Sequence, residues 1–430
     1  MTEFIPPGTR WIALPDGFAM KRGGTLHGAR IAYETWGELN AARDNAVLIL
    51  HALTGDSHVR GPAGPGHPTA GWWDDIVGPG APVDTDRWFV VAPNMLGGCQ
   101  GSTGPSSIAP DGYEWASRFP YLTIRDQVAA QVRLADALGV DRWAAVIGGS
   151  MGGMHALEWG VGHPERVERL AVLSAPPVTT ADQIALNGVQ LEAIQIDPRF
   201  AGGEYYDAPD GEGPHRGLAL ARRMALLNYR SPTELNQRFQ RSWQSDKSPL
   251  GHGGRFAVES YLDFHGNKFT RRFDANSYIA LVDAMDSHDV GRDRGGIEDA
   301  LARITATTLV LGIDSDRLFP VDGQHRIARG IRSTIDDGAV VQELGAQQLD
   351  GQGRAGALGA VAPPDHALRP GADALLQMEI SLEDGEVAAA DDQANAWFEK
   401  LARTAVVNGA ALDASASGPT ASSADTATAE

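Results

Sequence analysis

Short apolar runs rich in β-branched residues recur along the chain, and each ends near Gly, Pro or Ser. They read AVLIL at 46–50, WFVVAP at 88–93, WAAVI at 143–147, RLAVLSA at 169–175 and TTLVLGI at 307–313. Continuous apolar runs of this length are typical of strands that are buried on both faces of a parallel sheet. The run VVQEL at 340–344 is a weaker indication of a further strand.

A helical pattern lies between two of these runs, over residues 123–140. Apolar residues recur at every fourth position from Ile124, Thr123 and Asp126 have the spacing of a capping box, and Gly139 stands where a C-terminal cap is expected. Strands that alternate with helices predict an α/β fold with a mostly parallel central sheet.

The pattern changes over residues 178–295, which we call the lid segment. Strand-like runs disappear, and helical stretches such as 216–230 and 276–289 alternate with loops that contain Gly and Pro. We predict a mostly helical lid inserted into the sheet domain.

The sheet domain is predicted to comprise residues 1–177 and 296–403. Within it, residues 345–375 are rich in Gly, Ala and Pro and have no periodicity, so this stretch is expected to be irregular. Residues 384–403 have the pattern of a closing helix. Residues 404–430 are expected to form a disordered tail, because 413–430 contain too few apolar side chains to pack.

Composition narrows the functional classes. The formal net charge of −19 disfavours binding to nucleic acids or anionic membranes. The sequence contains no apolar run long enough to cross a membrane and no secretory signal pattern. The single cysteine, Cys99, excludes an intramolecular disulfide and suits a reducing compartment. These features predict a soluble, cytoplasmic protein, and we expect no metal site.

One motif carries chemistry: GGSMGG at 148–153 directly follows the predicted strand 143–147 and precedes an apolar stretch. A G-x-S-x-G sequence between a strand and a helix is the nucleophile elbow of the α/β-hydrolase fold. Glycines at 148 and 152 suit a crowded turn. The serine hydroxyl then stands at a helix N-terminus, which favours developing negative charge. Ser150 is therefore the predicted nucleophile.

A serine nucleophile needs a base, an orienting acid and donors for the oxyanion. In this fold the acid follows the nucleophile in the chain, and the strand 307–313 is followed by Asp314 and Asp316. We predict that Asp316 is the acid, with Asp314 as the alternative. The oxyanion donors are predicted to be the backbone N–H groups of Met151 and Leu53, the latter in the HALTG segment that follows strand 46–50.

Several blocks together resemble the homoserine O-acetyltransferase family, whose relatives include other serine and homoserine O-acyltransferases. The resemblance extends over roughly residues 10–345. It rests on HALTGDSH (51–58), PNMLGGCQGSTGPSS (93–107), TIRDQV (123–128), GGSMGGMHALEW (148–159), ARRMALLNYRS (221–231), YLDFHGNKFTRRFDANSYIALVDAMDSHDVGR (261–292) and GIDSDRLFP (312–320).

The resemblance implies a transfer reaction without a bound cofactor. Ser150 takes an acetyl group from the co-substrate acetyl-CoA and passes it to the hydroxyl of L-homoserine, on the route to methionine. Asp316 matches the family's triad acid, and Arg222 matches a lid arginine that helps to bind substrate; without the resemblance, Arg222 would be taken for a surface residue. The family's members are cytoplasmic homodimers.

The chain departs from the family pattern at the triad histidine. The family's G-H-D-x-F-L block has no match, since residues 340–356 read VVQELGAQQLDGQGRAG. The later histidines are His325, on a predicted helix, and His366, in the loop sequence PPDHALRP. His366 is the predicted base, supplied by a lengthened loop; the alternative is an altered C-terminal region that leaves the enzyme impaired.

Two other functions remain open from the sequence. An esterase results if water deacylates Ser150, and a non-catalytic binding protein results if no histidine reaches the serine. Succinyl-CoA as donor and serine as acceptor are also compatible with the residues.

Overall fold

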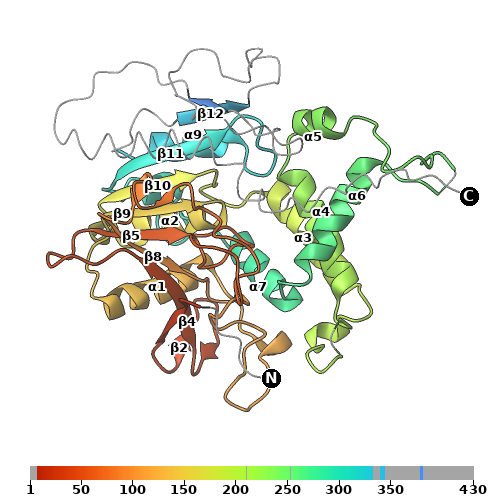
Figure 1. The fold of residues 1–430 in the computed structure, drawn as a ribbon. Helices are drawn as coiled ribbons and strands as arrows, with labels where there is room; N and C mark the ends of the chain where they lie inside the picture. Colours follow the sequence, from red (N-terminus) through yellow and green to blue (C-terminus); the bar gives the residue numbers. More distant parts are fainter. Residues whose placement is uncertain (1–6, 210, 252, 333–338, 344–377, 381–430) are drawn as a thin grey trace, which may run out of the picture.

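A nine-stranded sheet forms the centre of the molecule in the computed structural model, which describes residues 7–209, 211–251, 253–332, 339–343 and 378–380 (Figure 1). Its strands lie side by side in the order β1 (Arg10–Ala13), β4 (Arg30–Trp36), β8 (Phe89–Pro93), β5 (Ala46–Leu50), β9 (Ala145–Gly149), β10 (Arg169–Leu173), β11 (Thr307–Ile313), β12 (Ala339–Glu343) and β13 (Met378–Ile380). The strands from β8 to β12 are parallel, whereas β1, β4 and β13 pair antiparallel at the edges.

Two small two-stranded sheets accompany the central one. They pair β2 (Phe18–Ala19) with β3 (Thr25–Leu26) and β6 (Val77–Gly78) with β7 (Val83–Asp84). The helices of the described residues are α1 (Ile124–Leu138), α2 (Met151–Gly162), α3 (Ala181–Gln195), α4 (His215–Asn228), α5 (Pro232–Phe239), α6 (Ala257–Phe269), α7 (Ala275–Asp286), α8 (Ile297–Leu301) and α9 (Val321–Gly330).

Both faces of the central sheet are buried, which explains the continuous apolar runs. In β5, Leu48 and Leu50 join the core cluster that contains residues of α1 and α2, whereas Val47 and Ile49 join a second cluster on the other side. The second cluster is completed by residues of the segment 59–83. Successive side chains of a strand point to opposite faces, so a strand covered on both sides is apolar at every position.

Helix α1 begins and ends where the sequence predicts. Thr123 and Asp126 form a reciprocal capping box, and Gly139 closes the helix in the left-handed conformation (φ 68°). The caps satisfy backbone groups at both ends that have no partner inside the helix.

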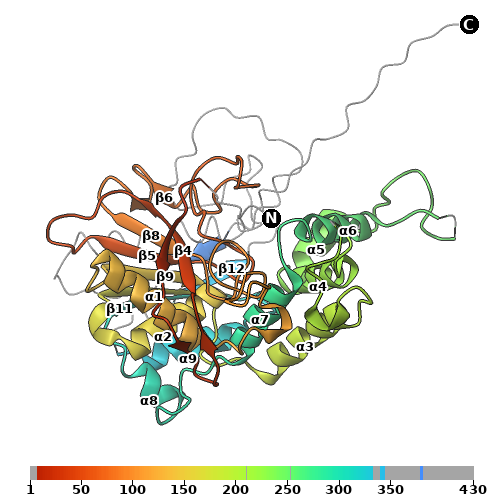
Figure 2. The same cartoon turned by 90° about the horizontal axis from the view of Figure 1, so that it is seen from below.

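The lid segment holds helices α3 to α7. Helices α3, α4, α5 and α6 lie together beside the sheet domain, and α7 lies between them and the sheet (Figures 1 and 2). The hydroxyl of Tyr278 on α7 donates a hydrogen bond of 2.6 Å to Gln190 on α3. The boundaries 178 and 295 remain predictions.

The main strand predictions are confirmed to within two residues at each end, and 340–344 corresponds to β12. Strand β4 was missed because Arg30, Glu34 and Thr35 interrupt its apolar pattern. The predictions for 345–375, 384–403 and 404–430 lie outside the described residues, apart from β13. Within the described part of the chain, no helix is long and apolar enough to cross a membrane.

Candidate active site

Ser150 occupies a strained turn between β9 and α2. Its backbone has φ 56° and ψ −122°, a conformation that side-chain-bearing residues rarely adopt. Its N–H donates to the carbonyl oxygen of Leu173 at 3.0 Å, which fixes the turn against the end of β10. The residue is half-buried rather than sealed in the core. These features are those of a nucleophile elbow.

The flanking glycines are required by backbone crowding. A β-carbon on Gly148 would lie 2.1 Å from the carbonyl oxygen of Gly152, and one on Gly152 would collide with the backbone of Leu50. Larger residues cannot occupy these positions without moving main chain. The predicted structural reason for the G-x-S-x-G spacing is therefore confirmed.

The two predicted oxyanion donors stand at the same edge of the sheet as Ser150. Met151 is the first residue of α2, and Leu53 lies in the turn that follows β5, whose Leu50 is in register with Gly148 of β9. Among the described residues, neither N–H donates a hydrogen bond. Their role as oxyanion donors remains a prediction.

The turn that carries Leu53 is held from inside by His51. The Gly55 N–H donates to the oxygen of Ala52 at 2.9 Å, and the same oxygen accepts from Nδ1 of His51 at 2.7 Å. The Nε2 atom of His51 accepts from the N–H of Met95 at 3.1 Å. Both ring nitrogens are occupied and burial lowers the pKa of the imidazole, so His51 is a neutral structural residue.

Asp316 follows β11, which is separated from β9 by β10, so the ends of these two strands lie about 10 Å apart. Its Oδ1 accepts from the N–H groups of Leu318 and Phe319, both at 2.9 Å. Its second oxygen makes no hydrogen bond with described residues and is available to an imidazole N–H. Burial raises the pKa of Asp316 to about 6. Asp314, the alternative acid, is exposed.

Arg222 is buried (7% exposed), so its interpretation as a surface residue is wrong. Its guanidinium lies over the rings of Phe269 and Tyr229, at 5.1 and 5.5 Å from their centroids. It also donates to the hydroxyl of Thr54, at 3.5 Å, in the turn that carries Leu53. A lid side chain thus contacts the loop beside the elbow.

The predicted base, His366, lies outside the described residues. Within the described ranges, no histidine is hydrogen-bonded to Ser150 or Asp316. His155 and His288 are fully buried and bonded to backbone carbonyls, and burial lowers their pKa values to about 3 and about 4. The identity of the base remains a prediction.

A cluster of Glu34, His58 and His67, missed by the sequence analysis, brings together potential metal ligands within 4.8 Å. The two imidazole rings are stacked 3.6 Å apart with an angle of only 9° between their planes. A metal ion lies close to the plane of each imidazole that binds it, and two nearly parallel rings at this distance cannot both satisfy that requirement. The arrangement suits hydrogen bonding to the carboxylate instead.

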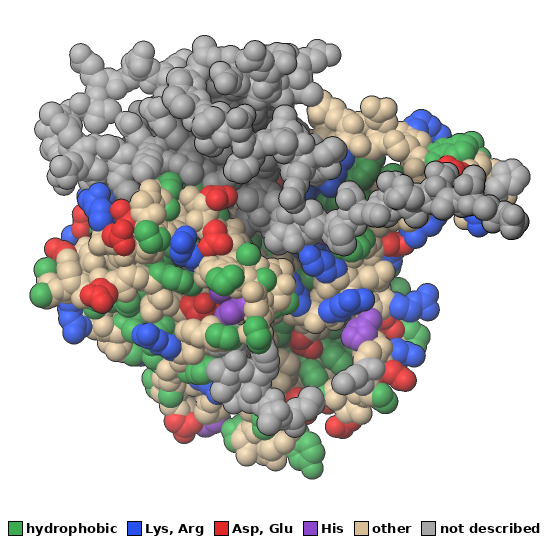
Figure 3. Space-filling view, in the orientation of Figure 1, with side chains coloured by type: hydrophobic (Ala, Val, Ile, Leu, Met, Phe, Trp, Pro, Cys, Tyr) green, Lys and Arg blue, Asp and Glu red, His purple; other side chains and the backbone are tan. Residues whose placement is uncertain are grey.

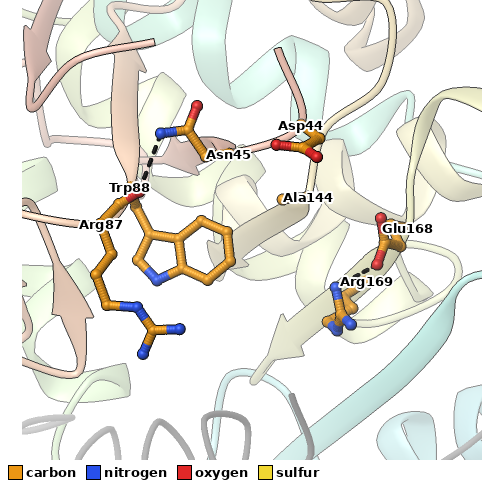
Figure 4. A pocket seen from close by; sticks show the side chains of 7 residues that line it. All are labelled: Asp44, Asn45, Arg87, Trp88, Ala144, Glu168 and Arg169. Carbon is orange, nitrogen blue, oxygen red and sulfur yellow. Dashed lines mark hydrogen bonds and ion pairs between the residues drawn. The ribbon is translucent and has the colours of Figure 1, made fainter. Parts of the chain in front are cut away.

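A cavity of about 340 Å³ lies at the opposite end of the sheet from Ser150. It is lined by Asp44, Asn45, Arg87, Trp88, Ala144, Glu168 and Arg169, which stand at or just before the starts of β5, β8, β9 and β10 (Figure 4). Ligands of open α/β sheets bind at the carboxyl ends of the strands. This cavity is therefore not where the predicted chemistry takes place.

Two further observations concern reactivity and surface charge. Burial raises the pKa of the Cys99 thiol to about 12, so the sulfur stays protonated and is not a competing nucleophile.

On the face drawn in Figure 3, described acidic and basic side chains are interspersed.

Comparison with known proteins agrees with this architecture. The family model described as alpha/beta hydrolase fold matches residues 45–345. The chain therefore belongs to the α/β-hydrolase fold proteins.

Curated relatives define the family more closely. The homoserine O-acetyltransferase of Clavibacter michiganensis is 69% identical over 79% of this chain and 87% of its own, and that of Leifsonia xyli is 71% identical over 78% and 83%. Among solved structures, the homoserine O-acetyltransferase of Bacillus anthracis is 27% identical with a TM-score of 0.72, covering 79% of this chain and 92% of its own. The chain belongs to the homoserine O-acetyltransferase family.

Proposed function

We propose that this protein transfers an acetyl group from acetyl-CoA to the hydroxyl of L-homoserine through an acetyl-Ser150 intermediate. The observation that carries the proposal is the strained elbow at Ser150, in a chain about 70% identical to curated homoserine O-acetyltransferases. Acetyl-CoA as donor and the covalent intermediate are both part of this proposal.

In the first half-reaction, the Ser150 hydroxyl attacks the thioester carbonyl of acetyl-CoA. The base, proposed to be His366, removes the hydroxyl proton, and Asp316 orients the imidazole through its second carboxylate oxygen. The negative charge that develops on the carbonyl oxygen is stabilised by the N–H groups of Met151 and Leu53. Collapse of the tetrahedral intermediate breaks the carbon–sulfur bond, and the base returns the proton to the leaving CoA thiol.

In the second half-reaction, the hydroxyl of L-homoserine attacks the acetyl-enzyme. The base removes the hydroxyl proton and later returns it to Ser150 as the ester is released. Arg222 is proposed to bind the carboxylate of the acceptor, since a guanidinium pairs with a carboxylate through two parallel hydrogen bonds. The aromatic rings of Tyr229 and Phe269 support the guanidinium in a fixed position.

Ester hydrolysis is the second function to consider, because a solved esterase resembles the chain equally in fold. That structure is 29% identical with a TM-score of 0.70 and covers 78% of this chain and 92% of its own. The fold alone therefore does not separate transfer from hydrolysis. The far higher identity to curated acetyltransferases favours transfer.

The test is to incubate the purified chain with acetyl-CoA, with and without homoserine, and to follow free thiol together with the mass of the products. We expect thiol release that depends on homoserine and yields O-acetylhomoserine. Ser150→Ala should abolish it, whereas Ser245→Ala, at an exposed site in the lid segment, should not. Thiol release that is indifferent to homoserine would identify a hydrolase, and parallel reactions with succinyl-CoA or serine would define donor and acceptor.

We also propose that the protein acts as a homodimer in the cytoplasm. Large apolar side chains are exposed on lid helices, among them Val189 on α3, Leu227 on α4 and Phe264 on α6. We propose that these side chains take part in the contact between the two chains, where association removes them from water. Sedimentation equilibrium should give twice the mass of one chain, and a single-chain mass would refute the dimer.

A further inference from the structure

The turn at residues 52–55 is hydrogen-bonded to Arg272, an arginine of the lid segment. Nη2 of Arg272 donates to the backbone oxygen of Thr54 at 2.6 Å, and its Nη1 lies 3.6 Å from Oδ2 of Asp56. One guanidinium therefore contacts Thr54 and Asp56, which lie one and three positions after Leu53. Charge-assisted hydrogen bonds of this kind are shorter and about twice as strong as neutral ones.

Arg272 is itself anchored to the sheet domain. It lies between α6 and α7, and its own backbone oxygen accepts from Nε2 of Gln100 at 2.8 Å. Gln100 belongs to the loop that follows β8, so both the main chain and the side chain of Arg272 are tied to loops at the carboxyl edge of the sheet. Because the main chain of Arg272 is already anchored, only its side chain has to be ordered for the contact with Thr54.

The inner and outer contacts of the turn are complementary. His51 holds the oxygen of Ala52 from within the core, and Arg272 holds the oxygen of Thr54 from the lid side. The Ala52 carbonyl belongs to the peptide plane that carries the Leu53 N–H, and the Thr54 carbonyl belongs to the plane between Thr54 and Gly55. The two contacts therefore fix the main chain on both sides of the Leu53–Thr54 peptide. With either contact absent, the main chain of the turn gains freedom to rotate.

We propose that Arg272 is a positioning residue, which fixes the turn at residues 52–55 so that the N–H of Leu53 is aimed at the reacting carbonyl oxygen. The inference rests on the proposed function for the role of Leu53, but the ordering of the turn by Arg272 is independent of it. Arg272 does not touch substrate in this assignment; it acts through Thr54.

Loss of Arg272 is expected to weaken stabilisation of the transition state rather than binding of the substrate. Donors that are already oriented stabilise the developing oxyanion without reorganisation, and loss of one such donor costs about 10²–10³-fold in kcat. Loss of a residue that only orients a donor should cost less, about 10–100-fold. Because the ground-state substrate gains little from the oxyanion donors, KM should change little.

The test compares Arg272→Gln with Arg272→Lys and with Arg271→Gln, a matched control at the exposed neighbouring arginine. Hydrogen–deuterium exchange of peptides covering residues 48–58 is measured alongside kcat and KM. We expect Arg272→Gln to accelerate exchange at the turn and to lower kcat with KM nearly unchanged. Arg272→Lys keeps a cationic donor and should recover part of the slow exchange at the turn and part of kcat. Arg271→Gln should match the wild type in exchange, kcat and KM.

The outcomes separate this inference from the proposed function. If Arg272→Gln leaves both exchange and kcat unchanged, or if kcat falls without faster exchange and lysine restores nothing, the positioning role is overturned. If the wild type fails to transfer acetyl groups, the proposed function fails, while exchange still decides whether Arg272 orders the turn. Faster exchange throughout the chain would indicate general destabilisation and would also overturn the proposal.

Discussion

A β-carbon on Gly152 would lie 2.0 Å from the carbonyl oxygen of Leu50. This contact joins the first turn of α2 to the end of β5, the strand that leads into the turn of Leu53. The backbone of the elbow therefore packs directly against the backbone that leads into the proposed oxyanion turn. A side chain at position 152 would have to displace backbone of α2 or of β5, and moving backbone costs more free energy than rotating a side chain.

Gly152→Ala is accordingly expected to lower the free energy of unfolding by about 1–3 kcal/mol and to reduce acetyl transfer severely, since overpacking forces backbone shifts at the site. The measurement is urea unfolding together with the thiol-release assay. Gly188→Ala is the matched control: Gly188 is exposed within α3, and a β-carbon there meets nothing within 4 Å. It should stabilise by about 0.5–1 kcal/mol through helix propensity. Equal stability of both variants would contradict the crowding argument.

Asp316→Asn should lower kcat by about 10⁴-fold, because the amide cannot hold the imidazole in the tautomer that the nucleophile needs. Asp314→Asn, at the exposed neighbouring acid, should have little effect. Steady-state kinetics of both variants check the assignment. A large loss in the Asp314 variant alone would exchange the two roles.

The raised pKa of Asp316 also predicts a stability effect with a definite sign. Burial raises this pKa to about 6, above the ordinary value of 3.8, so the folded chain binds a proton that the unfolded chain releases between these values. The stability that the protonated group contributes is fully present below about pH 4 and is lost as the pH rises to about 6. Asp316→Asn should therefore melt at or above the wild-type temperature at neutral pH, with an advantage that grows over this window and then levels off. A variant that melts lower at every pH would contradict this.

The sheet could be predicted from the sequence because its central strands are buried on both faces. Burial on both faces leaves a continuous apolar run that is visible without knowledge of the partner strands. Strand β4, which lies between the edge strand β1 and β8, carries Glu34, whose burial depends on Ser57 and His58 from a distant loop. Such a long-range hydrogen-bonded cluster leaves no periodic signal, and the strand was therefore missed.

The site was predictable where the chemistry is local. Ser150 and its glycines are set by one crowded turn, and Asp316 by its place after a strand. The contacts of Arg222 and Arg272 with Thr54 join positions that are far apart in the chain, so no spacing rule could reveal them. Local patterns show which residues react, whereas the residues that orient them emerge only from tertiary structure.

Arg222→Lys should raise KM for homoserine by about 10–100-fold, because lysine lacks the planar fork that pairs with a carboxylate and stacks on aromatic rings. Formation of the acetyl-enzyme from acetyl-CoA alone should be unaffected, since the acceptor takes no part in it. Arg216→Lys, at an exposed position of α4, is the control. The test is a set of homoserine saturation curves beside intact-mass measurement of the acetyl-enzyme. An unchanged KM would remove Arg222 from the acceptor site.

The Glu34 cluster predicts a pH-dependent contribution to stability. Burial disfavours the charged form of His58, but the hydrogen bond and the charge of Glu34 outweigh it, so the pKa of His58 is raised. Stability from this pair is fully present below about pH 6.5, the ordinary histidine value, and is lost as the pH rises through the raised pKa. Glu34→Gln removes the compensating charge and leaves burial to oppose protonation. Its melting temperature should therefore fall further below that of the wild type at about pH 6 than at about pH 8.5. Glu38→Gln, at an exposed position just beyond the same strand, is the control, and its melting temperature should differ from that of the wild type by the same amount at both pH values. If the difference for Glu34→Gln becomes smaller as the pH falls, the assigned coupling between Glu34 and His58 is refuted.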